Sequence, residues 1–217
     1  MANTSRISSD PQWIEAGPWI AAALASALAL GGAMLAANGA HRAGVEDAVR
    51  WTGRLAFAFF WPSYVGSALT TLFGDRFQPL RRQGRALGLA FAAVIAVHLS
   101  LVGWLCWIGD GPPAATFVLF GIAAFWVFAL ATSSIKPVAR EIGPAGWWVL
   151  RNIGMNYIAL VFALDFVRTQ HPFSLFKAVE YLPFAALAVL GPLLRLAAWF
   201  SRASRGTGFH PLDASTE

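Results

Sequence analysis

Six stretches of this 217-residue chain are long, apolar and almost free of charge. A helix needs about 20 apolar residues to cross a bilayer core of about 30 Å. Backbone that faces lipid must satisfy its own N–H and C=O groups, which a helix does. The stretches therefore predict an all-α integral membrane bundle of six transmembrane helices. The expected spans are about 16–40, 55–74, 86–109, 114–135, 144–167 and 178–200, with polar tails at 1–15 and 201–217.

The composition leaves no room for a large soluble domain. The chain is 57% hydrophobic and only 12% charged, whereas soluble domains carry about 25% charged residues. The single cysteine, Cys106, excludes a disulfide framework and a thiol metal cluster. The net charge of +5 comes from basic residues spread over short loops, a pattern that predicts membrane topology. The expected partners are membrane lipids and other membrane subunits, not nucleic acid.

The distribution of basic residues also predicts an orientation. If both termini are cytoplasmic, eleven of the 16 Lys and Arg residues lie on the inner side and five on the outer side. Cytoplasmic loops carry the excess of Lys and Arg in membrane proteins. We therefore expect a multi-pass protein of a bacterial-type inner membrane, with both termini in the cytoplasm.

His98 lies in the middle of the third expected span. Counted from the inner surface it is about 20 Å deep, at 1.5 Å per helical residue. An ionisable side chain at that depth marks a functional site by default. Its imidazole can bind haem iron, carry a proton or hydrogen-bond a neighbour. The structural alternative is a hydrogen bond to Asn156, which is expected at a similar depth on the fifth helix.

The fifth expected helix is unusually polar, because it carries Arg151, Asn152, Asn156 and Asp165. Arg151 is expected either to extend to the inner interface or to pair with a carboxylate, a lipid phosphate or a haem propionate. Glu180 and Arg195 on the sixth helix are expected to reach the interfaces in the same way.

Five short segments carry a family resemblance: Thr52-Gly53-Arg54-Leu55, Leu80-Arg81-Arg82-Gln83-Gly84-Arg85-Ala86-Leu87-Gly88-Leu89, Ala96-Val97-His98-Leu99, Ala131-Thr132-Ser133-Ser134 and Trp147-Trp148-Val149-Leu150. Across residues 50–167 the chain resembles the ferric-reductase-like transmembrane domain family, which includes the haem subunit of the bacterial methionine sulfoxide reductase system. The resemblance implies a six-helix bundle that carries b-type haem between its helices and passes electrons across the membrane. It implies an axial-ligand role for His98.

The chain departs from this family on the fifth helix. Where the family has a histidine after W-x-x-L, this chain has Arg151, and the region of the second histidine holds Leu164 and Asp165. A bis-histidine haem cannot form at the family's positions. Haem b could be kept with Met155 as the second ligand of the iron, or on His98 alone. Otherwise the site holds no cofactor, or a bound pigment or lipid.

Two functions follow from this departure. The first is a non-catalytic or haem-poor ferric-reductase-like membrane subunit that packs in a larger membrane complex. The second is a transmembrane electron-transfer subunit with b-type haem, with His98 as axial ligand and a separate redox partner. The small residues of the third helix fit either one: Gly84, Gly88, Ala92 and Ala96 recur every four residues. They permit close helix packing or leave room for a flat cofactor.

Overall fold

The computed structural model describes residues 11–109, 111, 113–168 and 175–206. Across these residues the chain forms helices and no strand. The elements are α1 (Pro11–Asn38), α2 (Arg42–Phe73), the short 3-10 helix η1 (Asp75–Phe77), α3 (Gln78–Trp107), α4 (Ala114–Ser133), α5 (Lys136–Arg168) and α6 (Leu175–Gly206). All six α-helices are long and apolar enough to cross a membrane. The all-α class and the multi-pass membrane character are thereby confirmed.

Several helices extend beyond the expected spans. α2 begins at Arg42 rather than near residue 55. Its first turns are polar, yet they are helical because neighbouring charges pair along the surface: Arg42 with Glu46 at 2.9 Å, and Arg50 with Asp47 at 2.7 Å. Hydropathy therefore locates the apolar part of α2 and not the residue at which the helix begins.

α5 contains a break close to its beginning. Gly143 has φ +71° and ψ 168°, which is not helical. Glycine adopts a positive φ without the steric cost that a Cβ imposes. Pro144 then occupies the first turn of the next helical segment, where its missing N–H is not needed. The apolar part of α5 thus starts at Pro144, the residue at which the sequence pattern places the span.

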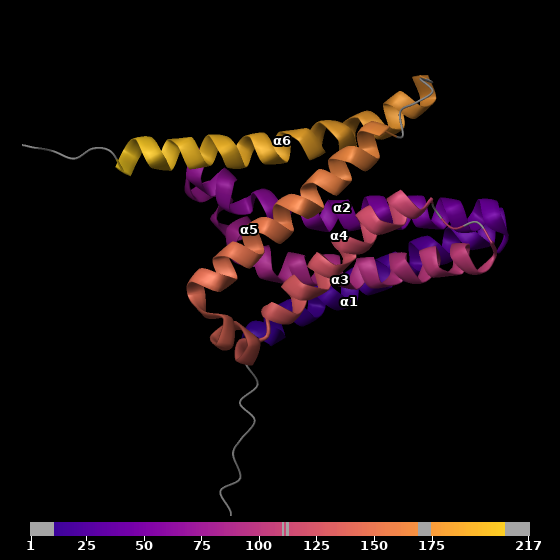
Figure 1. Ribbon diagram of the computed structural model, residues 1–217, viewed down its shortest axis with the longest axis horizontal. Helices are drawn as coiled ribbons and strands as arrows, with labels where there is room; N and C mark the ends of the chain where they lie inside the picture. The colour runs from indigo at the N-terminus through magenta and orange to yellow at the C-terminus, as the bar shows by residue number, and fades with distance from the viewer. Residues whose placement is uncertain (1–10, 110, 112, 169–174, 207–217) are drawn as a thin grey trace, which may run out of the picture.

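Five helices close a ring in the order α2, α3, α4, α5, α6, and α1 packs outside it against α2 and α3. In Figure 1, α5 runs obliquely across the molecule beneath α6. α4 packs closely on α5 but only lightly on α3. We call this lightly packed boundary the α3–α4 seam. It is the place where the ring is least tightly closed.

Aromatic side chains fill the interior of the ring. Phe57 and Phe60 of α2 lie 5.0 Å from Phe166 and 5.3 Å from Phe91 respectively, measured between ring centroids. Phe162 stands 5.1 Å from Phe57 and so extends the cluster along α5. Tilted and edge-on ring pairs of this kind add to the stabilisation from burial. The ring therefore has a packed aromatic core and is not an open pore.

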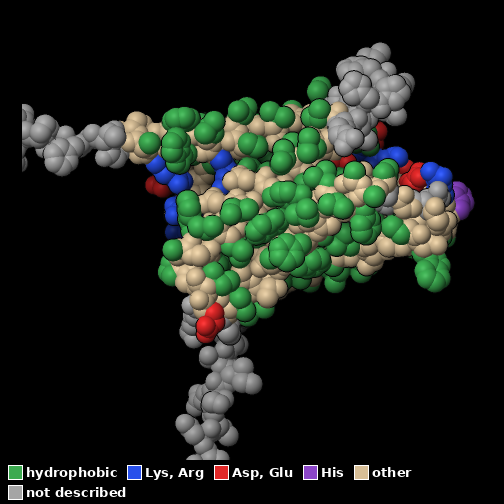
Figure 2. Space-filling model, viewed as in Figure 1, with side chains coloured by type: hydrophobic (Ala, Val, Ile, Leu, Met, Phe, Trp, Pro, Cys, Tyr) green, Lys and Arg blue, Asp and Glu red, His purple; other side chains and the backbone are tan. Residues whose placement is uncertain are grey.

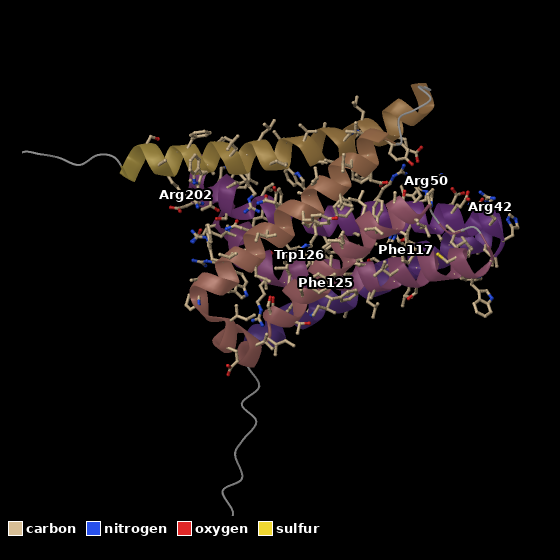
Figure 3. All side chains as sticks on the ribbon, in the orientation of Figure 1. Arg42, Arg50, Phe117, Phe125, Trp126 and Arg202 are labelled. Atoms are coloured by element: carbon tan, nitrogen blue, oxygen red, sulfur yellow. The ribbon has the colours of Figure 1, made fainter. Side chains whose placement is uncertain are left out.

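The described chain begins and ends at the same end of the bundle (Figure 1). We call it the Arg82 end, because described basic side chains gather there: Arg76, Arg81, Arg82, Arg85, Arg151, Arg195 and Arg202. The opposite end, which includes Arg42 and Arg50, is the Arg50 end. Figure 3 labels Arg202 at the first end and Arg42 and Arg50 at the second. In Figure 2 the charged side chains cluster at the two ends, and hydrophobic side chains cover the surface between them, as a bilayer requires.

Candidate functional site

Two cavities lie between the α2–α3 pair and the α4–α5 pair. The first has a volume of about 430 Å³ and includes His98, so we call it the His98 cavity. The second has a volume of about 390 Å³ and lies at the Arg82 end; we call it the arginine cavity. Both volumes are in the range of small-molecule sites. Phe91, Val127 and Ile158 line both cavities and are themselves buried, so they separate one cavity from the other.

His98 is fixed against α2 by a hydrogen bond. Its Nδ1 lies 3.1 Å from Oγ1 of Thr52. The Thr52 hydroxyl has one proton, which it donates to the carbonyl of Ala48 at 2.7 Å. The hydroxyl oxygen therefore accepts a hydrogen bond from Nδ1–H. That tautomer leaves a lone pair on Nε2, the form in which imidazole accepts a hydrogen bond or binds a metal.

Gly53 provides the space that this ring position needs. A Cβ at residue 53 would stand 3.4 Å from Cε1 of His98 and 3.7 Å from Nδ1. A larger side chain would push the imidazole away from α2. Thr52 thus accepts the hydrogen bond from His98, and Gly53 leaves the space that the ring occupies.

His98 and Asn156 are not brought together. Asn156 instead accepts a hydrogen bond from the Tyr64 hydroxyl at 2.8 Å. Counting residues from the inner surface treats α3 and α5 as parallel helices that start at one plane, whereas α5 crosses the bundle obliquely (Figure 1). The α5 residues that line the His98 cavity are Ile158, Val161, Phe162, Asp165 and Phe166.

Met155 is likewise separate from His98. It lines the arginine cavity, on the other side of Phe91 and Ile158. Along α3, His98 lies about 10 Å beyond Phe91, whereas Met155 precedes Ile158 by almost one turn on α5. No second histidine, methionine or cysteine is present among the described residues that line the His98 cavity. These residues fit a haem bound through His98 alone and do not fit a His98–Met155 pair.

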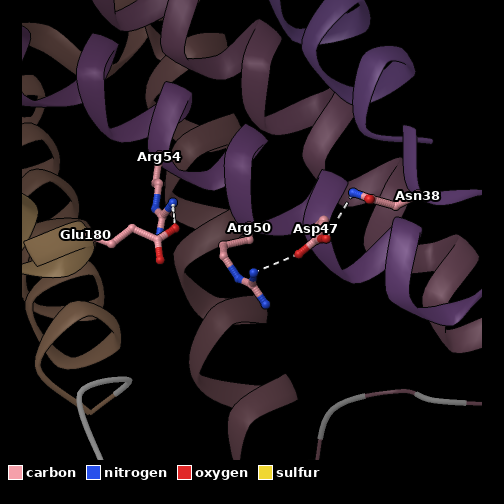
Figure 4. A network of polar contacts seen from close by, with 5 residues as sticks. All are labelled: Asn38, Asp47, Arg50, Arg54 and Glu180. Carbon is pink, nitrogen blue, oxygen red and sulfur yellow. Dashed lines mark hydrogen bonds and ion pairs between the residues drawn. The ribbon is translucent and has the colours of Figure 1, made fainter. Parts of the chain in front are cut away.

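The sequence pattern missed Arg54, which lines the His98 cavity. Its side chain is only 3% exposed, and its Nη1 donates to Oε1 of Glu180 at 2.5 Å. Figure 4 shows this pair linking α2 to α6. The guanidinium carbon also lies 4.5 Å from the Tyr181 ring centroid and 4.7 Å from that of Trp51. Nε and Nη2 have no hydrogen-bond partner in the described part of the chain, and the aromatic rings supply the remaining favourable contact.

Glu180 therefore pairs across the bundle, and the expectation that it simply reaches an interface does not describe its contact. One feature of the sequence could have identified Arg54 as a site residue: a cation and a carboxylate lie at the same end of two apolar helices, α2 and α6. Next to this pair, Asp47 accepts from Asn38 at 3.1 Å and from Arg50 at 2.7 Å, which ties α1 to α2 (Figure 4).

The other polar residues of α5 connect three helices. Arg195 of α6 donates to Oδ1 of Asn152 at 2.6 Å, and its guanidinium carbon lies 4.5 Å from the Tyr64 ring centroid. Tyr64 of α2 in turn donates to Asn156. Polar side chains between membrane helices commonly satisfy one another in this way. Asn152 and Asn156 thus have a structural role, and Arg195 belongs to the same network.

The arginine cavity is strongly basic. Arg81, Arg82 and Arg85 reach it from α3, and Arg151 reaches it from α5. Its described lining residues include no Asp or Glu. Arg85 donates to the carbonyl of Ser134 at 2.7 Å, and Arg151 lies over the Trp147 ring at 5.3 Å. Arg151 is thus half-buried beside the cavity, where an anionic group could reach it.

Of the other histidines, His41 occupies the N-cap position of α2 and lines neither cavity, and His171 and His210 lie outside the described residues. Among the residues that the structure describes, no three His, Cys, Asp or Glu side chains are close enough together to hold a metal ion. No protein-family model, curated protein or solved structure matches this chain.

Proposed function

We propose that this protein is a non-catalytic membrane subunit that holds a lipid-soluble ligand in the His98 cavity. The observation that carries the proposal is the contact of His98 Nδ1 with the Thr52 hydroxyl: because that hydroxyl donates its proton to Ala48, we infer that Nδ1–H is the donor and that the lone pair of Nε2 is available. A ligand for this atom must offer a metal centre or a hydroxyl or N–H donor. A metal-centred pigment and a hydroxyl-bearing lipid both satisfy that condition.

The remainder of the cavity suits an apolar ligand. Its lining includes Ile95, Val102, Phe117 and Phe120 beside His98. Ligand sites combine many apolar contacts with a few placed polar groups, and this cavity has that composition. The cavity also lies along the α3–α4 seam, between helices long enough to span the bilayer. A ligand that partitions into lipid would be concentrated next to it.

The second candidate is a b-type haem electron-transfer subunit with His98 as the one axial ligand from this chain and a separate redox partner. The same lone pair supports it. Arg50 and Arg54 also line the cavity, but each is already paired with a carboxylate of the chain, so they give a propionate little added attraction. The absence of a second iron ligand in the described lining favours the first candidate.

Membership of a larger complex and a ferric-reductase-like ancestry belong to the same proposal. Six membrane helices with a histidine inside α3 support the family resemblance. On α4 only Ala123, Val127 and Ser133 are fully buried, so the face of this helix that does not pack on α5 is available to lipid or to another subunit. The basic Arg82 end supports an inner-membrane orientation with both termini in the cytoplasm.

The test is to isolate the protein in native lipid with a membrane-solubilising polymer, then record its absorption spectrum and extract its lipid-soluble contents for mass spectrometry. Gly121 lines the His98 cavity, and a Cβ there would meet nothing within 4 Å, so Gly121→Leu fills the cavity without a clash. Gly103→Leu on α3 is the matched control, because Gly103 has the same free space but does not line the cavity.

The proposal expects one compound that is present with the wild type and Gly103→Leu and lost with Gly121→Leu and His98→Ala. A Soret band with a reduced α-band that disappears in His98→Ala would replace it with the haem candidate. Identical extracts and featureless spectra from all four proteins would overturn both.

A further inference from the structure

We propose that the arginine cavity binds the phosphate of an anionic phospholipid. This inference does not depend on the His98 ligand, because buried apolar residues separate the two cavities. It would assign a lipid-binding role to the end of the bundle that the proposed function leaves unused.

The charges of the cavity require an anion. Four arginines line it, and the described lining contributes no carboxylate. Arg81, Arg82 and Arg151 make no ion pair with any acidic side chain in the described part of the chain. Like charges around one space repel each other, and the repulsion is stronger where lipid and protein exclude water. A phosphate relieves it, because its oxygens accept charge-assisted hydrogen bonds from several guanidinium groups at once.

The serine hydroxyl groups of the cavity already donate to the backbone. Ser63 donates to the carbonyl of Gly84 at 2.8 Å. Ser133 and Ser134 both donate to the carbonyl of Leu130, at 2.9 Å and 2.8 Å. Each serine has already used its single proton on the backbone. Recognition of an anion therefore comes from arginines on two helices, and an anion bound there would connect α3 to α5.

The walls favour a phospholipid over a soluble anion. Apolar side chains line the inner part of the cavity, among them Phe60, Leu89, Phe91, Met155 and Ile158. A small soluble phosphate would leave these side chains without contact. A lipid can place its phosphate among the arginines and an acyl chain along the apolar wall. Basic pockets between transmembrane helices bind anionic headgroups in the same manner.

Gly84 makes the cavity accessible to a test. It lines the cavity, and a Cβ at this position would meet nothing within 4 Å. Gly84→Leu therefore reduces the cavity while all four arginines remain. Arg151→Gln and Arg82→Gln remove charge while the volume changes little. Arg76→Gln is the matched control, because Arg76 lies at the same end, over the Phe77 ring, and does not line the cavity.

The experiment is native mass spectrometry of the full chain after exchange into nanodiscs of phosphatidylcholine with a minor fraction of phosphatidylglycerol. The wild type and Arg76→Gln are expected to retain phosphatidylglycerol in preference to phosphatidylcholine. The preference should fall about fivefold in Arg151→Gln or Arg82→Gln, since a basic residue near the membrane surface contributes about that factor. It should fall further in the double variant and in Gly84→Leu. Circular dichroism of each variant confirms that it is folded.

Three results would overturn the inference. The first is equal retention of the two lipids by the wild type, and the second is full preference in the arginine variants. The third is complete displacement of phosphatidylglycerol from the wild type by inorganic phosphate, added in a parallel arm, which would identify a site for a soluble anion. If Arg151→Gln loses its helical signal, Arg151→Lys takes its place. Lysine keeps the charge and loses only the bidentate hydrogen bonding, so this variant should keep most of the preference for phosphatidylglycerol.

Discussion

Arg54 and Arg151 both lie within transmembrane helices, but the protein surrounds them differently. Arg54 pairs with Glu180 and lies against aromatic rings at 4.5 Å and 4.7 Å. Arg151 stacks on Trp147 and faces a cavity in which the other charged residues are also arginines. A buried cation that loses its carboxylate is left uncompensated, which destabilises the fold strongly. A cation without one leaves a place for an anion from outside the chain.

The largest expected effect is on the paired arginine. Glu180→Gln leaves the charge of Arg54 without its ion-pair partner in a site that is 3% exposed. We expect a loss of about 2 kcal/mol in the free energy of unfolding, less than for a fully buried pair. The reasons are that the Glu180 side chain is 39% exposed and that Asp165 also interacts with the Arg54 charge. Unfolding in mixed detergent micelles, followed by circular dichroism, measures it.

Glu46→Gln is the control for that measurement. Glu46 pairs with Arg42 at 2.9 Å on an exposed surface, and such pairs contribute less than about 1 kcal/mol. Equal losses in the two variants would contradict the distinction between a buried and a solvated ion pair. The double variant Arg54→Leu/Glu180→Leu should recover stability relative to Glu180→Gln, because it leaves no unpaired charge.

A smaller effect is expected at the His98 cavity. Thr52→Val removes the acceptor of Nδ1–H, at a cost of about 1 kcal/mol for the hydrogen bond. The tautomer preference of His98 should weaken at the same time. Nitrogen-15 NMR of histidine-labelled protein reports the tautomer directly. Ser100→Ala, which removes an exposed hydroxyl bonded to its own helix, should change neither quantity. An unchanged tautomer in Thr52→Val would mean that Thr52 does not fix the ring.

Smaller still is the coupling between Tyr64 and Asn156. A double-mutant cycle with Tyr64→Phe and Asn156→Leu isolates their hydrogen bond, because the contacts of Tyr64 with Arg195 are lost equally in both Asn156 backgrounds and cancel. Hydrogen bonds between membrane helices average about 0.6 kcal/mol, and we expect a coupling energy of that size. Strict additivity of the two single variants would show that the hydrogen bond does not stabilise the bundle.

The smallest expected effect on stability is at Arg151, the arginine without a carboxylate partner. Arg151→Gln loses only a cation–π contact, so its free energy of unfolding in lipid-free detergent should differ from the wild type by about 0.5 kcal/mol or less. Added phosphatidylglycerol should stabilise the wild type more than this variant, because a ligand of the folded state raises stability by mass action. A loss as large as that of Glu180→Gln would show that Arg151 is a structural residue like Arg54.

The membrane architecture could be predicted from the sequence because lipid imposes a strict demand on backbone and side chains. The break at Gly143 and Pro144 was also readable, since proline begins a helical segment more readily than it continues one. Arg54 was not recognised as a site residue, because a charged residue beside an apolar run reads as a loop. Only the partner on α6 shows that this charge is inside the bundle.

The pairing of polar residues between helices could not be predicted either. His98 and Asn156 have comparable depth when residues are counted along straight helices, but the tilt of α5 brings Asp165 and not Asn156 to the His98 cavity. The cavities themselves arise from the lightly packed boundary between α3 and α4, and helix tilt and separation depend on contacts spread over many residues. His98, Arg151 and Met155 were singled out from the sequence as possible ligand contacts, and each lines a cavity, but their division between two cavities depends on three-dimensional packing.

The α3–α4 seam has a consequence for how ligands would reach this protein. Both cavities lie along it, so their occupants would enter sideways from the bilayer and not from the aqueous phase. Occupancy would then depend on the mole fraction of the ligand among the surrounding lipids. Changing the lipid composition of the membrane would change the occupancy of the cavities, whereas diluting the cells or vesicles that contain the protein would not.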